Sequence, residues 1–186
     1  MKENENSIFY PPGGILIWII IVLEIVTFSM GIGSLLYQKS KNIDEFLKMQ
    51  STLSLTYGLW NTVFLITSGF FMALTIHYHK AKIKKGVSIS LLIAIVFGCF
   101  FLFLKSLEYI GKWNSNYTLH TSDFFAYYWL LTGFHFVHVL VGVIILLYVF
   151  TIKDEILLEN LEASASFWHM CDLIWIFLFP ALYLVR

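Results

Sequence analysis

The sequence predicts an all-α fold, a polytopic transmembrane bundle of five helices. Hydrophobic residues make up 59% of the 186 residues and charged residues 13%, whereas a soluble domain carries about 25% charged residues. Five apolar runs are long enough to cross a bilayer core of about 30 Å, which takes roughly 20 helical residues. The runs lack the alternation of barrel strands. Backbone groups inside a bilayer must be satisfied internally, so each run is expected to be a helix.

The predicted spans cover about 14–37, 56–76, 87–107, 124–150 and 167–185, within a single membrane domain over 1–186. A Pro-Pro-Gly-Gly break at 11–14 precedes the first span. That run is too long for the core of a signal peptide, so it is expected to be an uncleaved span. The segment 153–162 is amphipathic. It is expected either to lie along the inner interface or to extend the fourth span.

Charge distribution predicts the orientation of the chain. Four lysines, at 80, 82, 84 and 85, follow the second span, and such a cluster stays cytoplasmic by the positive-inside rule. The N-terminus is then cytoplasmic and the C-terminus lies on the other side. Over the whole chain, 12 Lys and Arg balance 12 Asp and Glu, so net charge gives no argument for a nucleic-acid partner.

Glu24 is the strongest functional candidate, because ionisable residues inside a membrane are costly and by default functional. It lies ten residues after Gly14, which places it about 15 Å deep, near the bilayer centre. Thr27, Phe28 and Gly31 share its helix face. One interpretation is a carboxyl that exchanges protons or gates lipid. The other is a neutral Glu hydrogen-bonded to a neighbouring helix.

The other spans carry polar residues with structural interpretations. In the second span, Asn61 and Ser68 share a face, and small or polar residues of this kind favour helix packing. In the third, Lys105 and Glu108 can pair near the outer interface, although a lysine that snorkels to the interface is preferred. His135 and His138 in the fourth span, and His169 and Asp172 in the fifth, complete the set.

Three intramembrane histidines raise the possibility of haem or metal binding. A zinc site needs three or four converging ligands, and bis-histidine haem needs two histidines at matching depth. The predicted topology does not place these histidines together, so hydrogen-bonded structural histidines are expected and no metal site is assigned. The sequence has no nucleotide-binding glycine loop, zincin motif or serine triad. No catalytic residue is therefore assigned.

Six motifs, in order along nearly the whole chain, resemble subunit III of the haem–copper oxidase superfamily. They include an embedded glutamate, a Thr-Gly-x-His-x-x-His signature and a Trp-His-x-x-Asp-x-x-Trp signature. The motifs lie at 12–18, 23–28, 61–69, 103–109, 128–139 and 167–177. With five spans, the chain is similar to the shorter bacterial form of the family.

The resemblance implies a non-catalytic subunit of a terminal oxidase in a bacterial inner membrane, with cytochrome c or quinol as donor. Haem and copper would sit in partner subunits I and II. This chain would hold no cofactor, stabilise subunit I, and bind phospholipid in a cleft that supports proton uptake or oxygen access. The resemblance implies that Glu24 is the functional carboxyl. The expected cleft residues are Glu24, Phe28, His135, Trp168 and Trp175.

Three alternatives remain open at this point. The closest is an accessory subunit of a nitric oxide reductase from the same family. A small transporter or proton channel is disfavoured, because no inverted repeat or pair of broken helices is visible. An autonomous haem protein is the third.

Overall fold

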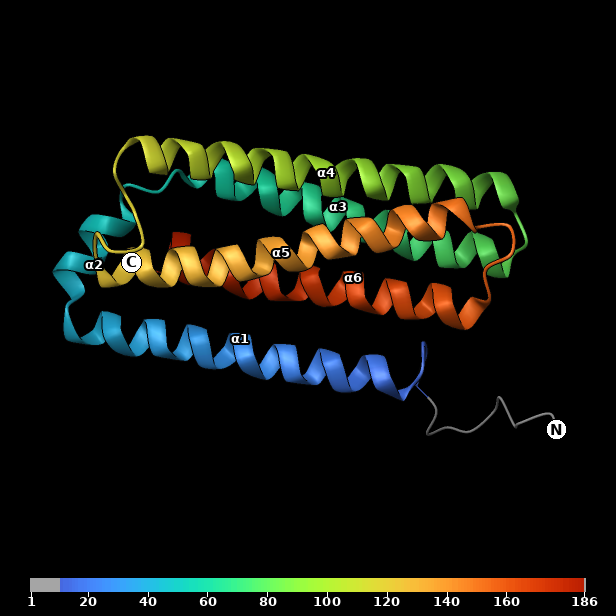
Figure 1. Ribbon diagram of the computed structural model, residues 1–186, viewed down its shortest axis with the longest axis horizontal. Helices are drawn as coiled ribbons and strands as arrows, with labels where there is room; N and C mark the ends of the chain where they lie inside the picture. Colours follow the sequence, from blue (N-terminus) through green and yellow to red (C-terminus); the bar gives the residue numbers. More distant parts are fainter. Residues whose placement is uncertain (1–10, 186) are drawn as a thin grey trace.

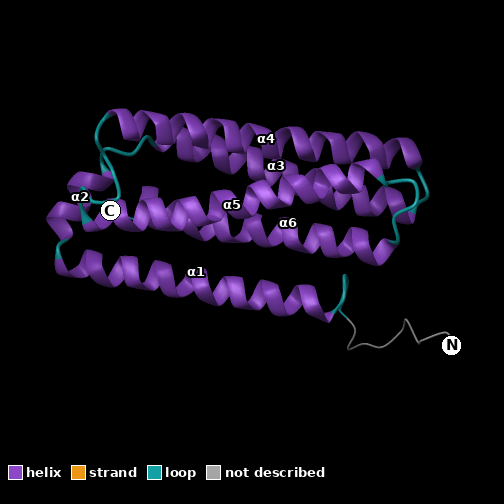
Figure 2. Ribbon diagram, viewed as in Figure 1, coloured by secondary structure: helices purple, strands orange, loops and turns teal. Residues whose placement is uncertain are grey.

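The computed structural model describes residues 11–185. All regular secondary structure within this range is helical, and Figure 2 shows the helices joined by short loops. The N-terminal residues 1–10 and Arg186, whose sides of the membrane were predicted above, lie outside the described residues. The elements are α1 Ile15–Lys41, α2 Ile43–Gln50, α3 Leu55–Lys80, α4 Lys84–Asn114, α5 Asp123–Thr151, α6 Leu158–Phe179 and the π-helix η1 Pro180–Leu184.

The predicted five-helix bundle is confirmed. Five helices in the described range are long and apolar enough to cross a membrane: α1, α3, α4, α5 and the continuous α6–η1 segment. Helix α3 packs most extensively on α4, α6 lies against both α3 and α5, and α1 packs against α5 and α6 (Figure 1). The α3–α4 and α5–α6 loops share one end of the bundle (Figure 1), and α2 lies at the other end, where the Gln50 side chain donates to the carbonyl of Leu182 in η1 at 3.0 Å.

Two glycines shape the entry to α1. Gly13 and Gly14 have φ angles of 78° and 85°, which glycine adopts without the steric penalty of a side chain. A Cβ on Gly13 would also lie 2.5 Å from the Cα of Ala163 in α6. The indole of Trp18 donates to the carbonyl of Pro12 at 3.0 Å and fixes the turn.

Trp168 fills the centre of the bundle. It is fully buried, and its ring lies between two glycines of neighbouring helices. A Cβ on Gly98 of α4 would come within 2.8 Å of the ring, and one on Gly142 of α5 within 2.7 Å. Small residues at such crossings allow close packing of helices. Ser68 joins this layer, since its hydroxyl donates to the carbonyl of Ala94 at 2.6 Å.

Two parts of the fold differ from the sequence-based expectation. Helix α2 was not predicted; it is short, with acidic residues in its first turn and Lys48 in its last, an arrangement that suits the helix dipole. The segment 153–162 neither extends α5 nor forms an interfacial helix of its own. Helix α5 ends at Thr151 and α6 begins at Leu158, so the last membrane helix starts well before the predicted position 167.

Candidate functional site

The candidate site begins with the contact between Glu24 of α1 and His138 of α5. Glu24 Oε1 lies 3.3 Å from His138 Nε2, and the two side chains are 22% and 14% exposed. The other imidazole nitrogen, Nδ1, lies 2.8 Å from the carbonyl oxygen of Phe134. A carbonyl can only accept a hydrogen bond, so Nδ1 must carry a proton.

This geometry determines how protons are shared. With Nδ1 protonated, a neutral His138 offers Nε2 as an acceptor, and Glu24 must then be the donor in its protonated form. Alternatively, His138 is an imidazolium and Glu24 a carboxylate. A proton between Oε1 and Nε2 can therefore reside on either residue. Glu24 Oε2 is buried and has no hydrogen-bond partner among residues 11–185.

The sequence of α1 explains why Glu24 meets α5. Residues Ile21, Phe28 and Leu35 recur every seven positions and are the buried residues of this helix. Glu24 lies between the first two of them, at the edge of the stripe. The ring of Phe28 then packs edge-on against His138, with centroids 5.9 Å apart. Burial of this stripe thus presents the carboxyl to the imidazole.

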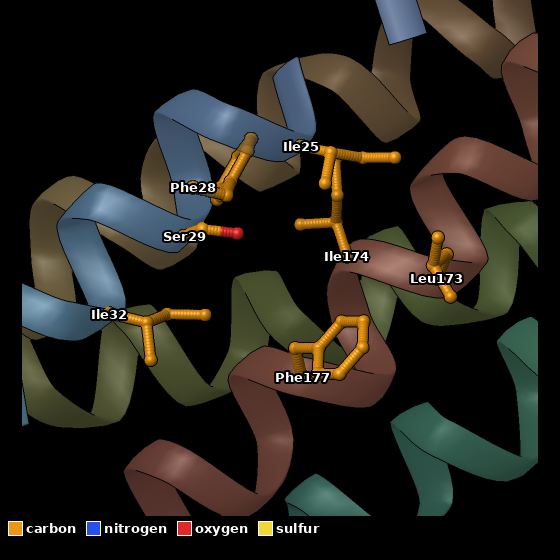
Figure 3. A pocket seen from close by; sticks show the side chains of 7 residues that line it. All are labelled: Ile25, Phe28, Ser29, Ile32, Leu173, Ile174 and Phe177. Atoms are coloured by element: carbon orange, nitrogen blue, oxygen red, sulfur yellow. The ribbon is translucent and has the colours of Figure 1, made fainter. Parts of the chain in front are cut away.

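A small apolar hollow lies beside this pair, between α1 and α6 (Figure 3). Its volume is about 20 Å³, which suits about one water molecule and is too small for an acyl chain. Of the five residues expected in a lipid cleft, Phe28 lines this hollow. Its lining comprises Ile25, Phe28, Ser29, Ile32, Leu173, Ile174 and Phe177.

Three of the expected cleft residues lie in the core of the bundle instead. His135, Trp168 and Trp175 are fully buried. The indole of Trp168 donates to the Ser68 hydroxyl at 3.1 Å, and that of Trp175 donates to the Thr62 hydroxyl at 2.9 Å. Both tryptophans thus join α6 to α3.

The His135 ring stacks on Trp175 with centroids 5.4 Å apart. It also meets Phe28 and Phe101 edge-on, at 6.3 and 5.7 Å. Neither ring nitrogen has a hydrogen-bond partner in the described part of the chain. The structure therefore brings His135, Phe28 and Trp175 together as an aromatic cluster rather than as a lined cleft.

Lys105 does not snorkel, and that expectation is wrong. Its side chain is 1% exposed, and its ammonium lies 2.9 Å from Glu108 Oε2. It also donates to the hydroxyls of Tyr128 at 3.2 Å and Tyr183 at 2.9 Å, while Tyr183 donates to Glu108 Oε1 at 2.7 Å. We call these four residues the lysine cluster. It joins α4, α5 and η1 inside the bundle.

Tyr183 was missed at the sequence level, although a signal for it existed. Pro180 interrupts the last apolar run, and proline disturbs the helical hydrogen-bond ladder. Here the chain widens into η1, where the Val185 amide bonds the Pro180 carbonyl at 2.9 Å. The π-helix carries Tyr183 to Lys105, 78 residues earlier in the sequence.

The remaining polar residues behave differently from one another. His169 Nδ1 lies 3.2 Å from Asp172 Oδ2, and this pair packs against Gly69 of α3, where an added Cβ would collide with the carboxylate. Asn61 is fully buried, and its side-chain amide has no partner among the residues described. Between residues 11 and 185, no three His, Cys, Asp or Glu side chains gather as a metal site.

Five apolar helices with buried polar clusters define a multi-pass membrane protein. A family model described as Cytochrome c oxidase subunit III matches residues 46–185, and the chain belongs to that family. The matched residues include the lysine cluster and the fourth- and fifth-span histidines. They leave out α1 and therefore Glu24.

Individual relatives carry the name "Cytochrome c oxidase subunit 3". The one from Myxine glutinosa is 32% identical over 133 residues, covering 67% of this chain and 49% of the relative. The one from Rhipicephalus sanguineus is 35% identical over 132 residues, with 67% and 49% covered. The chain spans about half the length of these two relatives. A relative from Spodoptera frugiperda is 30% identical over 134 residues, with 67% of this chain and 86% of that protein covered.

Proposed function

We propose that this chain is the non-catalytic membrane subunit III of a haem–copper terminal oxidase in a bacterial inner membrane. It would assemble with subunits I and II, which would hold the haem and copper, and it would stabilise subunit I. The observation that carries the proposal is the family match over residues 46–185. The relatives' printed name favours a cytochrome c oxidase over the nitric oxide reductase branch.

We further propose that Glu24 and His138 support proton uptake by that complex. The support is geometric: Glu24 Oε1 and His138 Nε2 lie 3.3 Å apart, and a proton between these two atoms can reside on either residue. Such a pair is neutral overall while it holds one proton, either as a carboxylic acid beside a neutral imidazole or as an ion pair, so the proton can pass between the two residues inside the membrane without creating an unpaired charge. Glu24 has the more exposed side chain of the two, so it is the residue of the pair that faces the surroundings of the bundle more openly.

A lipid-bearing cleft at the α1–α6 seam is part of the same proposal. The hollow there is lined by isoleucines, phenylalanines and Leu173, side chains that suit an acyl chain. Because its volume is about 20 Å³, a lipid would lie along the outside of the seam or require α1 to move away from α6. Oxygen, a small apolar molecule, would follow the same apolar seam.

Purification from solubilised membranes tests the assembly. A haem-bearing partner should copurify with the full chain and reduce oxygen. Purification as a stable monomer, from membranes without such a partner, would end the oxidase assignment. A partner that reduces nitric oxide instead would transfer the chain to the reductase branch.

Glu24→Gln tests the proton role in the assembled complex. Glutamine keeps the shape and can still hydrogen-bond His138, but it cannot carry the shared proton. Assembly and initial activity should survive, while sustained turnover or pumping efficiency should fall. Glu155→Gln is the matched control, because Glu155 is exposed in the α5–α6 loop. Complete loss of initial activity in an assembled Glu24→Gln complex would contradict a supporting role.

A further inference from the structure

His169 is a polar side chain on the outer surface of the bundle, far from both membrane interfaces. It lies 11 residues after Leu158, where α6 begins, and 15 residues before Leu184, where η1 ends. At 1.5 Å per residue these separations are about 16 Å and about 22 Å along the helix axis. The His169 side chain is nevertheless 44% exposed. An imidazole is too short to reach either interface from this depth, so His169 opens onto the middle of the membrane.

The surface around His169 is otherwise apolar. Leu173 and Ile176 follow it at i+4 and i+7 on α6 and are 39% and 44% exposed. On α3, Ile66 is 49% exposed and lies one turn before Gly69, which packs against the His169 side chain. We call His169, Leu173, Ile176 and Ile66 the His169 face. A lone imidazole within such a face is costly in hydrocarbon unless its polar atoms are paired.

Asp172 determines which hydrogen-bonding group His169 presents outward. Nδ1 of the ring lies 3.2 Å from Asp172 Oδ2, and Nε2 makes no hydrogen bond within residues 11–185. A net charge is costly at this depth, so the pair is expected to be neutral overall. It is then either a carboxylic acid that donates to Nδ1, with the ring hydrogen on Nε2, or a carboxylate beside an imidazolium, in which both ring nitrogens carry hydrogen. In both states Nε2 is a donor.

Thr27 shows how another exposed polar side chain in a span is satisfied. Its hydroxyl donates to the carbonyl of Leu23, in its own helix, at 2.8 Å. The His169 ring has its Nδ1 edge held by Asp172 against α3, which leaves its Nε2 edge toward the outside of the bundle. Histidines in membrane spans commonly pair with an adjacent helix. The Nε2 donor therefore needs an acceptor from another molecule.

We infer that the His169 face docks a transmembrane helix of the haem-bearing partner subunit, and that this helix offers Nε2 a neutral hydrogen-bond acceptor at mid-membrane. A hydroxyl, a carboxamide or a free backbone carbonyl has that chemistry. A carboxylate would bring a second charge to the same depth. The identity of the partner rests on the proposed function, to which this inference adds the surface that meets it and the contact that orients it.

A second copy of this chain does not supply the acceptor. In a two-fold contact each subunit presents the same patch, so the His169 face would meet itself and oppose two Nε2 donors. The other members of the face are leucine and isoleucine, whose side chains carry no acceptor. Hydrocarbon chains of lipid carry none either. The complementary partial charge therefore comes from a different protein.

Site-specific photo-crosslinking in the assembled complex tests the location. The crosslinker p-benzoylphenylalanine replaces Ile176 on the His169 face or, as a matched control, Phe103, which is 63% exposed on α4. Irradiation should join position 176, and not position 103, to the haem-bearing subunit. A crosslink to that subunit from position 103 alone, or from neither position, would overturn docking on this face while the oxidase assignment stands. Copurification of no haem-bearing subunit would end both.

Competition for the partner tests the hydrogen bond. His169→Phe keeps a ring of similar size and removes the donor, whereas His169→Gln retains a donor. Each variant is coexpressed with the tagged wild-type chain. Mass spectrometry then gives the ratio of the two chains in the complex, divided by their ratio in the whole membrane. The control is Ser106→Ala, because the Ser106 hydroxyl already bonds the Leu102 carbonyl of its own helix at 2.8 Å.

Incorporation of His169→Phe should fall roughly tenfold, the scale of one hydrogen bond between membrane helices. Incorporation of His169→Gln and of Ser106→Ala should stay close to that of the wild-type chain. Undiminished incorporation of His169→Phe would overturn the hydrogen bond to the partner. An equal loss for His169→Gln would show that a donor at this position does not matter, and would overturn it as well.

Discussion

Replacing Lys105 by Met should destabilise the protein more than any other single lysine substitution proposed here. Met fills a similar volume, but it removes the hydrogen bonds from the ammonium to Glu108, Tyr128 and Tyr183. Glu108 is 3% exposed, so its carboxylate would be left buried beside one tyrosine hydroxyl. Removing one partner of a buried ion pair costs about 3–5 kcal/mol. The free energy of unfolding should fall by that amount.

The assay is a denaturant titration of the detergent-solubilised protein, followed by circular dichroism. Lys48→Met is the control; its side chain is exposed on α2, and little change is expected. The double variant Lys105→Met with Glu108→Leu leaves no unpaired charge and should recover part of the loss, with an interaction energy of about 0.5–3 kcal/mol. An unfolding free energy for Lys105→Met equal to that of Lys48→Met would refute the reasoning.

Three further predictions concern other parts of the bundle. A hydrophobic carbodiimide should label Glu24 in preference to the exposed Glu155, because the reagent partitions into the membrane and needs a protonated carboxyl. Peptide mapping by mass spectrometry identifies the labelled residue, and equal labelling of Glu24 and Glu155 would contradict the prediction. Gly98→Ala should cost about 1–3 kcal/mol by forcing Trp168 aside, whereas Gly111→Ala, with open space around its Cβ, should be neutral or stabilising in the same titration. Lys84→Cys should react with a membrane-impermeant thiol reagent in inverted vesicles but not in intact cells, and labelling from outside would reverse the predicted orientation.

The spans were predictable because bilayer thickness sets the length of an apolar helix. Five apolar runs were enough to give the number of spans without any knowledge of their neighbours. Helix α2 escaped this criterion because it is short and mixed in composition. It is held by Phe46, which is 1% exposed and meets Phe124 edge-on with centroids 5.9 Å apart. Phe124 lies 78 positions after Phe46 in the sequence, so no local sequence pattern predicts this contact.

The polar residues of the site were predictable by identity but not by partner. Depth along a helix singled out Glu24, and its contact with His138 required the relative rotation of α1 and α5. Lys105 was misjudged for the same reason, since position near a helix end favours snorkelling. Tyr128 and Tyr183 surround the Lys105 ammonium instead. The π-helix that begins at Pro180 positions Tyr183 there. Tertiary partners thus overrode the local expectation.

The sparse burial of α1 has a consequence for the order of events during synthesis. Its hydrogen-bond partners on α5 follow much later in the chain: Ser34 pairs with Tyr127, 93 residues on, and Gln38 with Asp123, 85 residues on. At about 5–20 residues per second, translation takes roughly 5–20 s to cover that distance. During this time α1 has entered the membrane without its docking surface, and Glu24 has no imidazole to share its proton. Helix α1 is therefore made before the surface that it packs against and is seated late among the described helices.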